Sequence, residues 1–138
     1  MRLLAAALLC PLWLCACAPA PEPPAPGTDP MTGCFATGPR RSVDFRVDHQ
    51  GGQYRLSLFR DGQWQPQDEP LHPASAAELA RYFPDNGEQI ASALLGHNGA
   101  FGLFLLVPEA TLKSRDRNSD YLALLVIGTG PVYRRHCD

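Results

Sequence analysis

Three oxygen-bearing side chains occupy alternate positions near the end of the chain: Asp116, Asn118 and Asp120. Alternating Asp and Asn residues open the EF-hand calcium loop, in which carboxylate and carbonyl oxygens surround the ion. The rest of that loop is missing, because Tyr121 stands where the sharp turn needs glycine and Ile127 stands where a bidentate glutamate closes the site. The pattern therefore favours a solvated loop, and we expect no bound metal or cofactor.

Nucleophile and metal signatures are missing from the sequence. It contains no Gly-x-Ser-x-Gly elbow, no His-Glu-x-x-His, no phosphate-binding glycine loop and no paired cysteines at zinc spacing. The histidines are scattered: His49, His72, His97 and His136. His136 precedes Cys137, which would fit a metal or thiol site unless the sulfur is part of a disulfide. We expect exposed histidines and no enzyme activity.

The start of the chain carries a clearer chemical signal. Arg2 is followed by an apolar run over 3–14, which is too short to span a bilayer as a mature helix and has the length of a signal-peptide core. Just beyond it, Cys17 has Ala16 directly before it and Leu14 three residues before it. This segment resembles the lipobox of bacterial lipoproteins, in which a dedicated peptidase cuts immediately before the cysteine.

The resemblance implies that Cys17 becomes the mature N-terminus, with a diacylglycerol on its thiol and a further acyl chain, such as palmitate, on its amino group. Several acyl chains make a stable membrane anchor, at about 0.8 kcal/mol per buried methylene. An Asp after the cysteine retains such lipoproteins in the inner membrane, so Ala18 implies the outer membrane, with the domain facing the periplasm. The alternative is an ordinary secretory signal with a chance cysteine.

Two cysteines remain for the folded part, Cys34 and Cys137, because Cys10 and Cys15 leave with the signal and Cys17 is acylated. In an oxidising periplasm such a pair predicts one disulfide. It would close a loop of about 100 residues, for which loop-closure entropy gives about 4.7 kcal/mol. The alternative is a pair of free buried thiols.

Two arginine pairs lie close to these cysteines. A disulfide holds its two Cα atoms within about 7 Å, so it would bring the pairs together as a basic corner. The four residues of the basic corner are Arg40, Arg41, Arg134 and Arg135. Guanidinium groups suit carboxylates and phosphates, such as those of peptidoglycan peptides, lipid headgroups and acidic proteins. The alternative is neutralisation by nearby carboxylates in ordinary surface pairs: Asp44, Asp48 and Asp138.

Composition predicts one small domain behind a spacer. Removing a signal peptide of 16 residues from the 138 leaves 122, of which 17–31 form the acylated cysteine and a proline-rich linker. At about 3.1 Å per residue, that linker spans up to roughly 40 Å. Residues 32–138 suffice for one periplasmic core. The net charge of −2 gives no reason to expect nucleic acid as a partner.

Alternating apolar and polar residues over 43–58 predict a hairpin with one wet face, turning at Gln50-Gly51. The register that follows pairs Val47 with Tyr54, Phe45 with Leu56 and Val43 with Leu58. A second turn at Asp61-Gly62 would place Phe59 opposite Trp64 on the other face. We interpret this aromatic pair as a small core under a helix rather than as a binding surface.

That helix is predicted over 75–83, where Ser75 and Glu78 form a capping box. Residues 88–95 suit a helix or a strand, and the Asn98-Gly99 turn that follows favours a strand. The remaining predictions are central strands covered on both faces over 101–107 and 121–127, a charged loop over 113–120, a turn over 128–131 and a last strand over 132–136.

The predicted fold is α+β and mainly β, an antiparallel sheet or partly closed barrel with one short helix and one disulfide. The first functional hypothesis is an envelope lipoprotein whose non-catalytic domain binds a protein partner, as an inhibitor or immunity-type protein does. The second is a structural or assembly lipoprotein of an envelope complex. A cell-wall or lipid hydrolase is less favoured, because it needs converging His and carboxylate groups.

Overall fold

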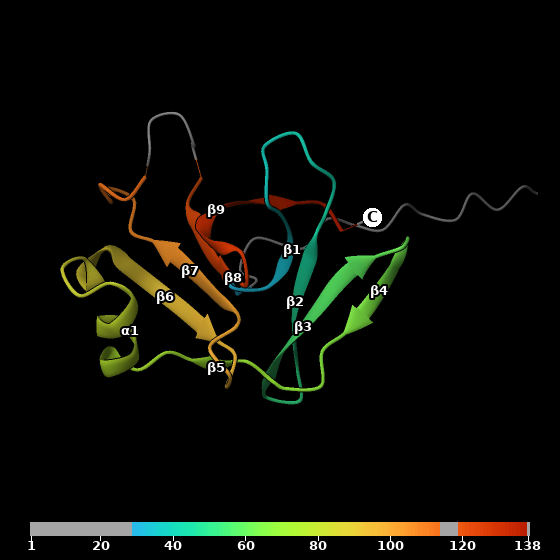
Figure 1. Ribbon diagram of the computed structural model, residues 1–138, viewed down its shortest axis with the longest axis horizontal. Coiled ribbons are helices and arrows are strands. Elements are labelled where there is room, and N and C mark those ends of the chain that lie inside the picture. Colours follow the sequence, from blue (N-terminus) through green and yellow to red (C-terminus); the bar gives the residue numbers. More distant parts are fainter. Residues whose placement is uncertain (1–28, 114–118, 138) are drawn as a thin grey trace, which may run out of the picture.

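The computed structural model describes residues 29–113 and 119–137, and within them nine strands form one antiparallel sheet (Figure 1). The sheet curls into a half-barrel with the strand order β4-β3-β2-β1-β9-β8-β7-β6-β5. The strands are β1 (Gly33–Ala36), β2 (Phe45–Gln50), β3 (Gln53–Arg60), β4 (Gln63–Pro66), β5 (His72–Pro73), β6 (Ile90–Leu95), β7 (Gly102–Leu106), β8 (Tyr121–Leu125) and β9 (Gly128–Arg135). The helical segments are α1 (Ala76–Tyr82) and the 3₁₀ turn η1 (Gly87–Gln89). The predicted fold class is confirmed.

The β2–β3 hairpin turns at Gly51-Gly52, one residue later than predicted. Both glycines have positive φ, 59° and 77°, a conformation that residues with a side chain rarely adopt. The structure pairs Val47 with Leu56 and Phe45 with Leu58, so the predicted register was wrong by two residues. Because side chains alternate with a period of two, the shift leaves the apolar residues of β2 and β3 on the predicted face. Val43 lies before β2, so its predicted pairing with Leu58 was wrong.

The Asp61-Gly62 turn and the pairing of Phe59 with Trp64 are confirmed. Alternation along β3 places Phe59 on the outer face of the curl, opposite buried Leu56, and its cross-strand pairing places Trp64 of β4 beside it. Their interpretation as a core under the helix was wrong, because α1 lies over β6 and β7 in the other half of the sheet (Figure 1). Trp64 is instead covered by Arg46, whose guanidinium carbon lies 4.8 Å from the ring centroid.

The helix α1 begins at the predicted capping box. The Ser75 hydroxyl oxygen accepts a hydrogen bond from the Glu78 backbone N–H, and a Glu78 carboxylate oxygen accepts one from the Ser75 N–H at 2.9 Å. Leu79 and Phe83 turn toward the outer face of the sheet, where they pack against Phe104. The strand predicted within 88–95 is confirmed as β6.

The last hairpin turns at Val126-Ile127, where the predicted strand continues. Leu125 pairs with Gly128, and residues 128–131 belong to β9, so the prediction of a turn there was wrong. Gly128 adopts φ of 127°, which is open to glycine and lets the chain enter β9 directly after a two-residue loop. The expected burial through Ile127 was also wrong, since that side chain is exposed.

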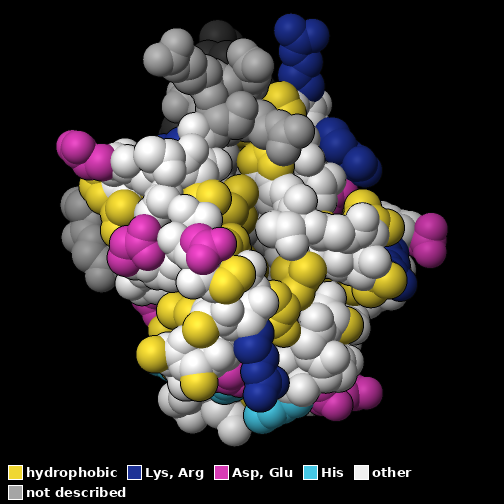
Figure 2. Space-filling model, turned by 60° about the vertical axis from the view of Figure 1, so that its left-hand side comes forward, with side chains coloured by type: hydrophobic (Ala, Val, Ile, Leu, Met, Phe, Trp, Pro, Cys, Tyr) yellow, Lys and Arg dark blue, Asp and Glu magenta, His cyan; other side chains and the backbone are white. Residues whose placement is uncertain are grey.

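Apolar side chains form two clusters on the two faces of the curled sheet. The larger cluster lies inside the curl and includes Phe35, Phe45, Val47, Leu94, Leu103 and Val132. The smaller cluster, centred on Phe104 and Leu95, lies between the outer face of β6 and β7 and the helix. Strand β7 is therefore covered on both faces, as predicted. Figure 2 turns the α1 side forward and shows hydrophobic side chains still reaching the surface beside polar ones.

Cys34 in β1 and Cys137 just beyond β9 are bonded, with their Cα atoms 5.3 Å apart. The two strands pair antiparallel, and Cys34 lies opposite Arg135. The disulfide therefore joins residues that are 103 positions apart at the middle of the sheet, where the first and last strands meet. The predicted disulfide is confirmed.

Candidate functional site

The half-barrel is open on one side, and the opening is a groove of about 660 Å³ between β3 and the tip of the β8–β9 hairpin. Its floor is formed by the buried side chains of Phe45, Leu56 and Phe101. Cavities that bind ligands in proteins span roughly 300–1,000 Å³ and are lined mainly by apolar side chains. The groove is thus large enough to receive several side chains of another molecule.

Val126 and Ile127 form an apolar lip at the edge of this groove, with 90% and 92% of their surface exposed. Tight turns usually carry Gly, Asn, Asp or Ser, so two β-branched aliphatic residues are not what the turn itself requires. Leu125, directly before them, packs against the core and holds the base of the hairpin in place. An exposed apolar tip beside an apolar floor is typical of an interaction surface.

Charged side chains line the groove as well, three carboxylates and one guanidinium: Asp44, Asp68, Glu69 and Arg60. Asp44 is occupied, since one oxygen accepts hydrogen bonds from Thr37 at 2.7 and 2.8 Å and the other pairs with Arg41 at 3.3 Å. Within 29–113 and 119–137, Asp68 and Glu69 make no ion pair or side-chain hydrogen bond. Their carboxylates are therefore open to a partner.

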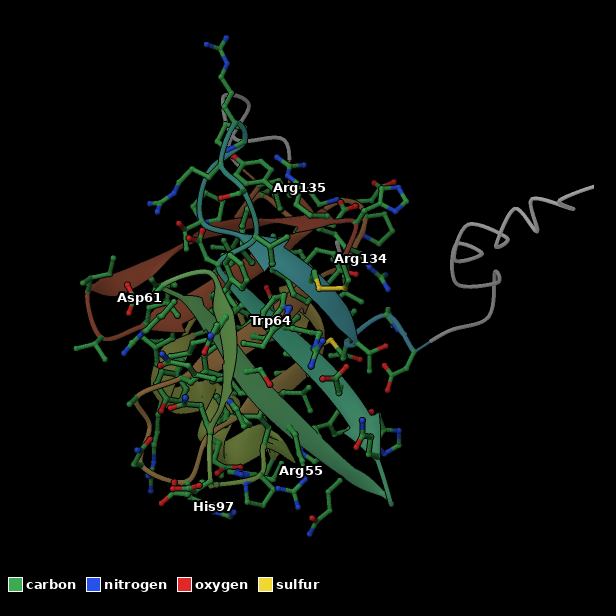
Figure 3. The ribbon with its side chains drawn as sticks, turned by 90° about the vertical axis from the view of Figure 1, so that its right-hand side faces the viewer. Arg55, Asp61, Trp64, His97, Arg134 and Arg135 are labelled. Carbon is green, nitrogen blue, oxygen red and sulfur yellow. A yellow bond between two sulfur atoms is a disulfide. The ribbon has the colours of Figure 1, made fainter. Side chains whose placement is uncertain are left out.

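The basic corner is less open than predicted, because β9 sends its two arginines to opposite faces of the sheet. Arg134 lies on the face of buried Val132, where it donates to the Thr32 carbonyl at 2.7 Å (Figure 3). It borders a second hollow, of about 300 Å³, which Asp29 and Asp48 also line. A hollow lined by charges of both signs gives no preference for an anion.

Arg135 lies on the other face and donates to the carbonyl of Pro39. This contact brings Arg135 to the turn that carries Arg40 and Arg41, whereas Arg134 stays apart. Arg41 pairs with Asp44, and exposed Arg40 makes no contact of this kind within the described residues. The structure thus brings Arg40, Arg41 and Arg135 together, and two of them, Arg41 and Arg135, already have partners within the chain.

A cluster of Ser75, Glu78 and His72 has the residue types of a hydrolytic triad in an unsuitable order. The Glu78 carboxylate lies in the middle, accepting from the Ser75 hydroxyl at 2.8 Å and lying 2.9 Å from the His72 ring. A nucleophilic serine needs the histidine as its base, between it and the carboxylate. The hydrogen bond from the Ser75 backbone, followed by those from His72 and the Ser75 hydroxyl, lowers the pKa of Glu78 to about 2. The cluster caps α1 and attaches it to β5.

The other histidines do not converge on a metal site. His97 stacks on His72 with ring centroids 4.9 Å apart, and His49 stacks on Tyr54. His136 is exposed beside the disulfide. In the part of the chain that the structure describes, no three His, Cys, Asp or Glu side chains gather as a metal site would require. Of the calcium-like spacing, Asp116 and Asn118 lie outside the described residues, and Asp120 pairs with Lys113.

Comparison of the chain with protein-family models, with curated proteins and with solved structures found no match. Across residues 29–113 and 119–137, no helix is long and apolar enough to cross a membrane. The lipobox-like segment with Cys17 lies outside the described residues. The function is therefore argued from the site itself.

The groove is the feature that the sequence did not reveal. Its lip was hidden in the apolar run over 121–127, which reads as a buried strand. The one signal in the sequence that could have located the lip is Gly128, directly after Val126 and Ile127. A glycine there allows a hairpin turn at these two residues in place of a longer strand.

Proposed function

We propose that the chain is a lipid-anchored protein of the cell envelope whose small domain binds a protein partner without catalysis, as an inhibitor or immunity-type protein does. The observation that carries the proposal is the groove with its exposed Val126-Ile127 lip. Protein interfaces gain most of their binding energy from apolar anchors that enter a pocket on the partner, surrounded by a polar rim. The lip supplies the anchors and the groove supplies the pocket.

The anchor is supported by the residues at the start of the chain. The apolar run over 3–14, the small residue before Cys17 and the six prolines between Ala18 and Pro30 are consistent with a signal peptide, an acylation site and a spacer. Intact mass of the native protein tests this part. We expect an acylated Cys17 as the first residue, and a Cys17→Ser variant that stays membrane-bound to the same extent would contradict it.

A second candidate is an assembly lipoprotein that docks into a larger envelope complex. It is favoured by Phe59 of β3, which is 38% exposed, borders the groove and lies next to the edge strand β4. An apolar side chain at a sheet edge is a natural contact for a neighbouring subunit. The first candidate is better supported, because the lip and groove expose more apolar surface than this one ring.

The test is capture of the partner by the native lipoprotein after cross-linking in intact cells. The test variant is Val126→Ser with Ile127→Asn, two residues that turns accept. The matched control is Ala77→Ser with Ala80→Ser, at exposed positions of α1 away from the groove. We expect the control to capture the same partner as the parent and the lip variant to lose it.

Equal capture by the lip variant and its control would overturn the proposal that the groove binds the partner. The nature of the complex then separates the two candidates. An inhibitor or immunity-type protein abolishes the activity of its partner when the purified pair is mixed. An assembly lipoprotein leaves that activity unchanged.

A further inference from the structure

We propose that the groove takes a partner segment that is apolar at its centre and positively charged at its flanks, an inference that rests on the function proposed above. The apolar centre follows from the floor and from the lip of Val126 and Ile127. The positive flanks follow from the carboxylates of Asp68 and Glu69, which stand at the rim of the same groove. Oppositely charged rims steer association and select the partner.

The backbone holds these two carboxylates at the rim. The N–H of Gln67, directly before Asp68, donates to the Leu56 carbonyl of β3 at 2.8 Å. The N–H of Leu71, two residues after Glu69, donates to the Tyr54 carbonyl at 2.8 Å. Both ends of this short segment are therefore fixed to β3, so little conformational entropy is lost when the carboxylates bind a cation.

The charge at the rim stays negative when every group in the groove is considered. Asp44 is satisfied by Thr37 and Arg41, and it needs no further cation. Arg60 is the one guanidinium among the described groove residues, against the two open carboxylates.

The same charges disfavour the two other occupants that an apolar groove suggests. A second copy of this chain would place Asp68 and Glu69 near identical carboxylates, and like charges across an interface are repulsive. An anionic membrane surface would be repelled by the same rim and by the net charge of −2. A polypeptide segment with an apolar centre and cationic flanks is complementary to both the apolar floor and the acidic rim of the groove.

The probes are two short peptides, each with a pair of leucines at its centre, one flanked by lysines and the other by glutamates. Binding is followed by fluorescence anisotropy with the full-length lipoprotein in a non-ionic detergent, and empty micelles serve as the blank. We expect the lysine peptide to bind at least roughly tenfold more tightly than the glutamate peptide, as two charge pairs at a rim would give. Raising the salt from about 0.1 M to about 1 M shortens the Debye length from about 10 Å to about 3 Å and should remove most of that difference.

The test variant is Asp68→Asn with Glu69→Gln, and the matched control is Asp85→Asn with Glu88→Gln. The control removes the same charge at exposed positions beyond α1 that do not line the groove. We expect the test variant to lose roughly tenfold in affinity for the lysine peptide, and the control to lose far less. Equal affinities of the two variants would overturn the inference.

Three further results would also overturn it: equal or tighter binding of the glutamate peptide, lip-dependent dimerisation in sedimentation, or lip-dependent binding to phosphatidylglycerol vesicles. Failure of the inference is distinguishable from failure of the proposed function. If the lip variant loses its cellular partner but the Asp68 and Glu69 variant keeps it at every salt concentration, the groove binds a partner that is not cationic. If the lip variant also keeps its partner, the proposed function falls.

Discussion

The groove and the basic corner differ in whether their charged groups already have partners within the chain. In the basic corner, Arg134 and Arg135 donate to backbone carbonyls and Arg41 pairs with Asp44. At the groove, two carboxylates are open and the apolar lip is exposed. The difference teaches that charged residues clustered by the fold need not be open to a partner, since three of these four arginines already have one. Free hydrogen-bonding capacity beside exposed apolar area is the better guide.

Arg134 and Arg135 are occupied because they lie where the first and last strands meet. Several segments end there, and their carbonyls are acceptors that need donors. An arginine carries five N–H donors, so it satisfies carbonyls of more than one segment. Arg134 donates to Thr32 and Arg135 to Pro39, both in the segments around β1. Arg134 and Arg135 therefore hold the two segments that flank β1 against β9.

The largest effect is expected at the disulfide, which holds the two strands of the basic corner together. Cys34→Ala and Cys137→Ala should each lower the free energy of unfolding by about 2–5 kcal/mol, because the bond closes a long loop. Thermal melts of the two variants, compared with the parent under oxidising conditions, measure this. If all three proteins melt at the same temperature, the bond does not stabilise the junction of β1 and β9.

The next effect concerns the lip, and it should appear in binding rather than in folding. Val126→Ser with Ile127→Asn should weaken partner binding about a hundredfold, since about 2–3 kcal/mol of apolar burial is lost. The melting temperature should stay the same or rise, because the removed side chains are exposed in the free domain. Titration of the purified partner and a thermal melt give the two numbers. A large fall in melting temperature would mean that the lip serves the fold.

At the basic corner we expect the reverse, a loss of stability with no loss of partner binding. Arg134→Gln with Arg135→Gln should lower the free energy of unfolding by about 1 kcal/mol, because hydrogen bonds to backbone carbonyls are lost. Partner binding should not change. Urea unfolding and the same titration measure both quantities. If the double variant melts like the parent but binds its partner weakly at low salt, the basic corner is the binding surface and the comparison is reversed.

The smallest effect is a pH dependence at the capping box of α1. The pKa of Glu78 is lowered from 4.5 to about 2, chiefly by the hydrogen bond from the Ser75 backbone. A carboxylate with a lowered pKa stabilises the fold above its unfolded pKa, and this contribution is lost as the pH falls from 4.5 toward 2.

Unfolding of the parent and of Glu78→Gln, measured across that pH range, tests the effect. The parent should be the more stable protein at neutral pH, and the difference should shrink as the pH approaches 2. A difference that does not change with pH would assign the effect of Glu78 to packing. Partner binding should be the same in both proteins at neutral pH, because the Glu78 carboxylate is paired within the chain and does not line the groove.

Local residue chemistry determined much of the fold. Ser75 and Glu78 start α1, Asp61-Gly62 make the β3–β4 turn, and Cys34 and Cys137 form the disulfide. The first two depend on a few neighbouring residues, and the third was predicted from the cysteines expected to remain in the folded part. The alternation of apolar and polar residues also predicted which face of β2 and β3 is buried, although the predicted register differs from the observed one by two residues. A displacement of two keeps the alternation intact, so the pattern could not detect it.

The tertiary structure decided where the chain presents a surface. The sequence pattern 121–127 is equally compatible with a long buried strand and with a shorter strand that ends in an exposed turn. Only the pairing of Leu125 with Gly128 makes Val126 and Ile127 a lip. The partners of Arg134 and Arg135 are likewise backbone carbonyls about a hundred residues away, at separations of 102 and 96. Backbone carbonyls are the same at every residue type, so which of them meets an arginine depends on how the sheet curls and not on the sequence around either one.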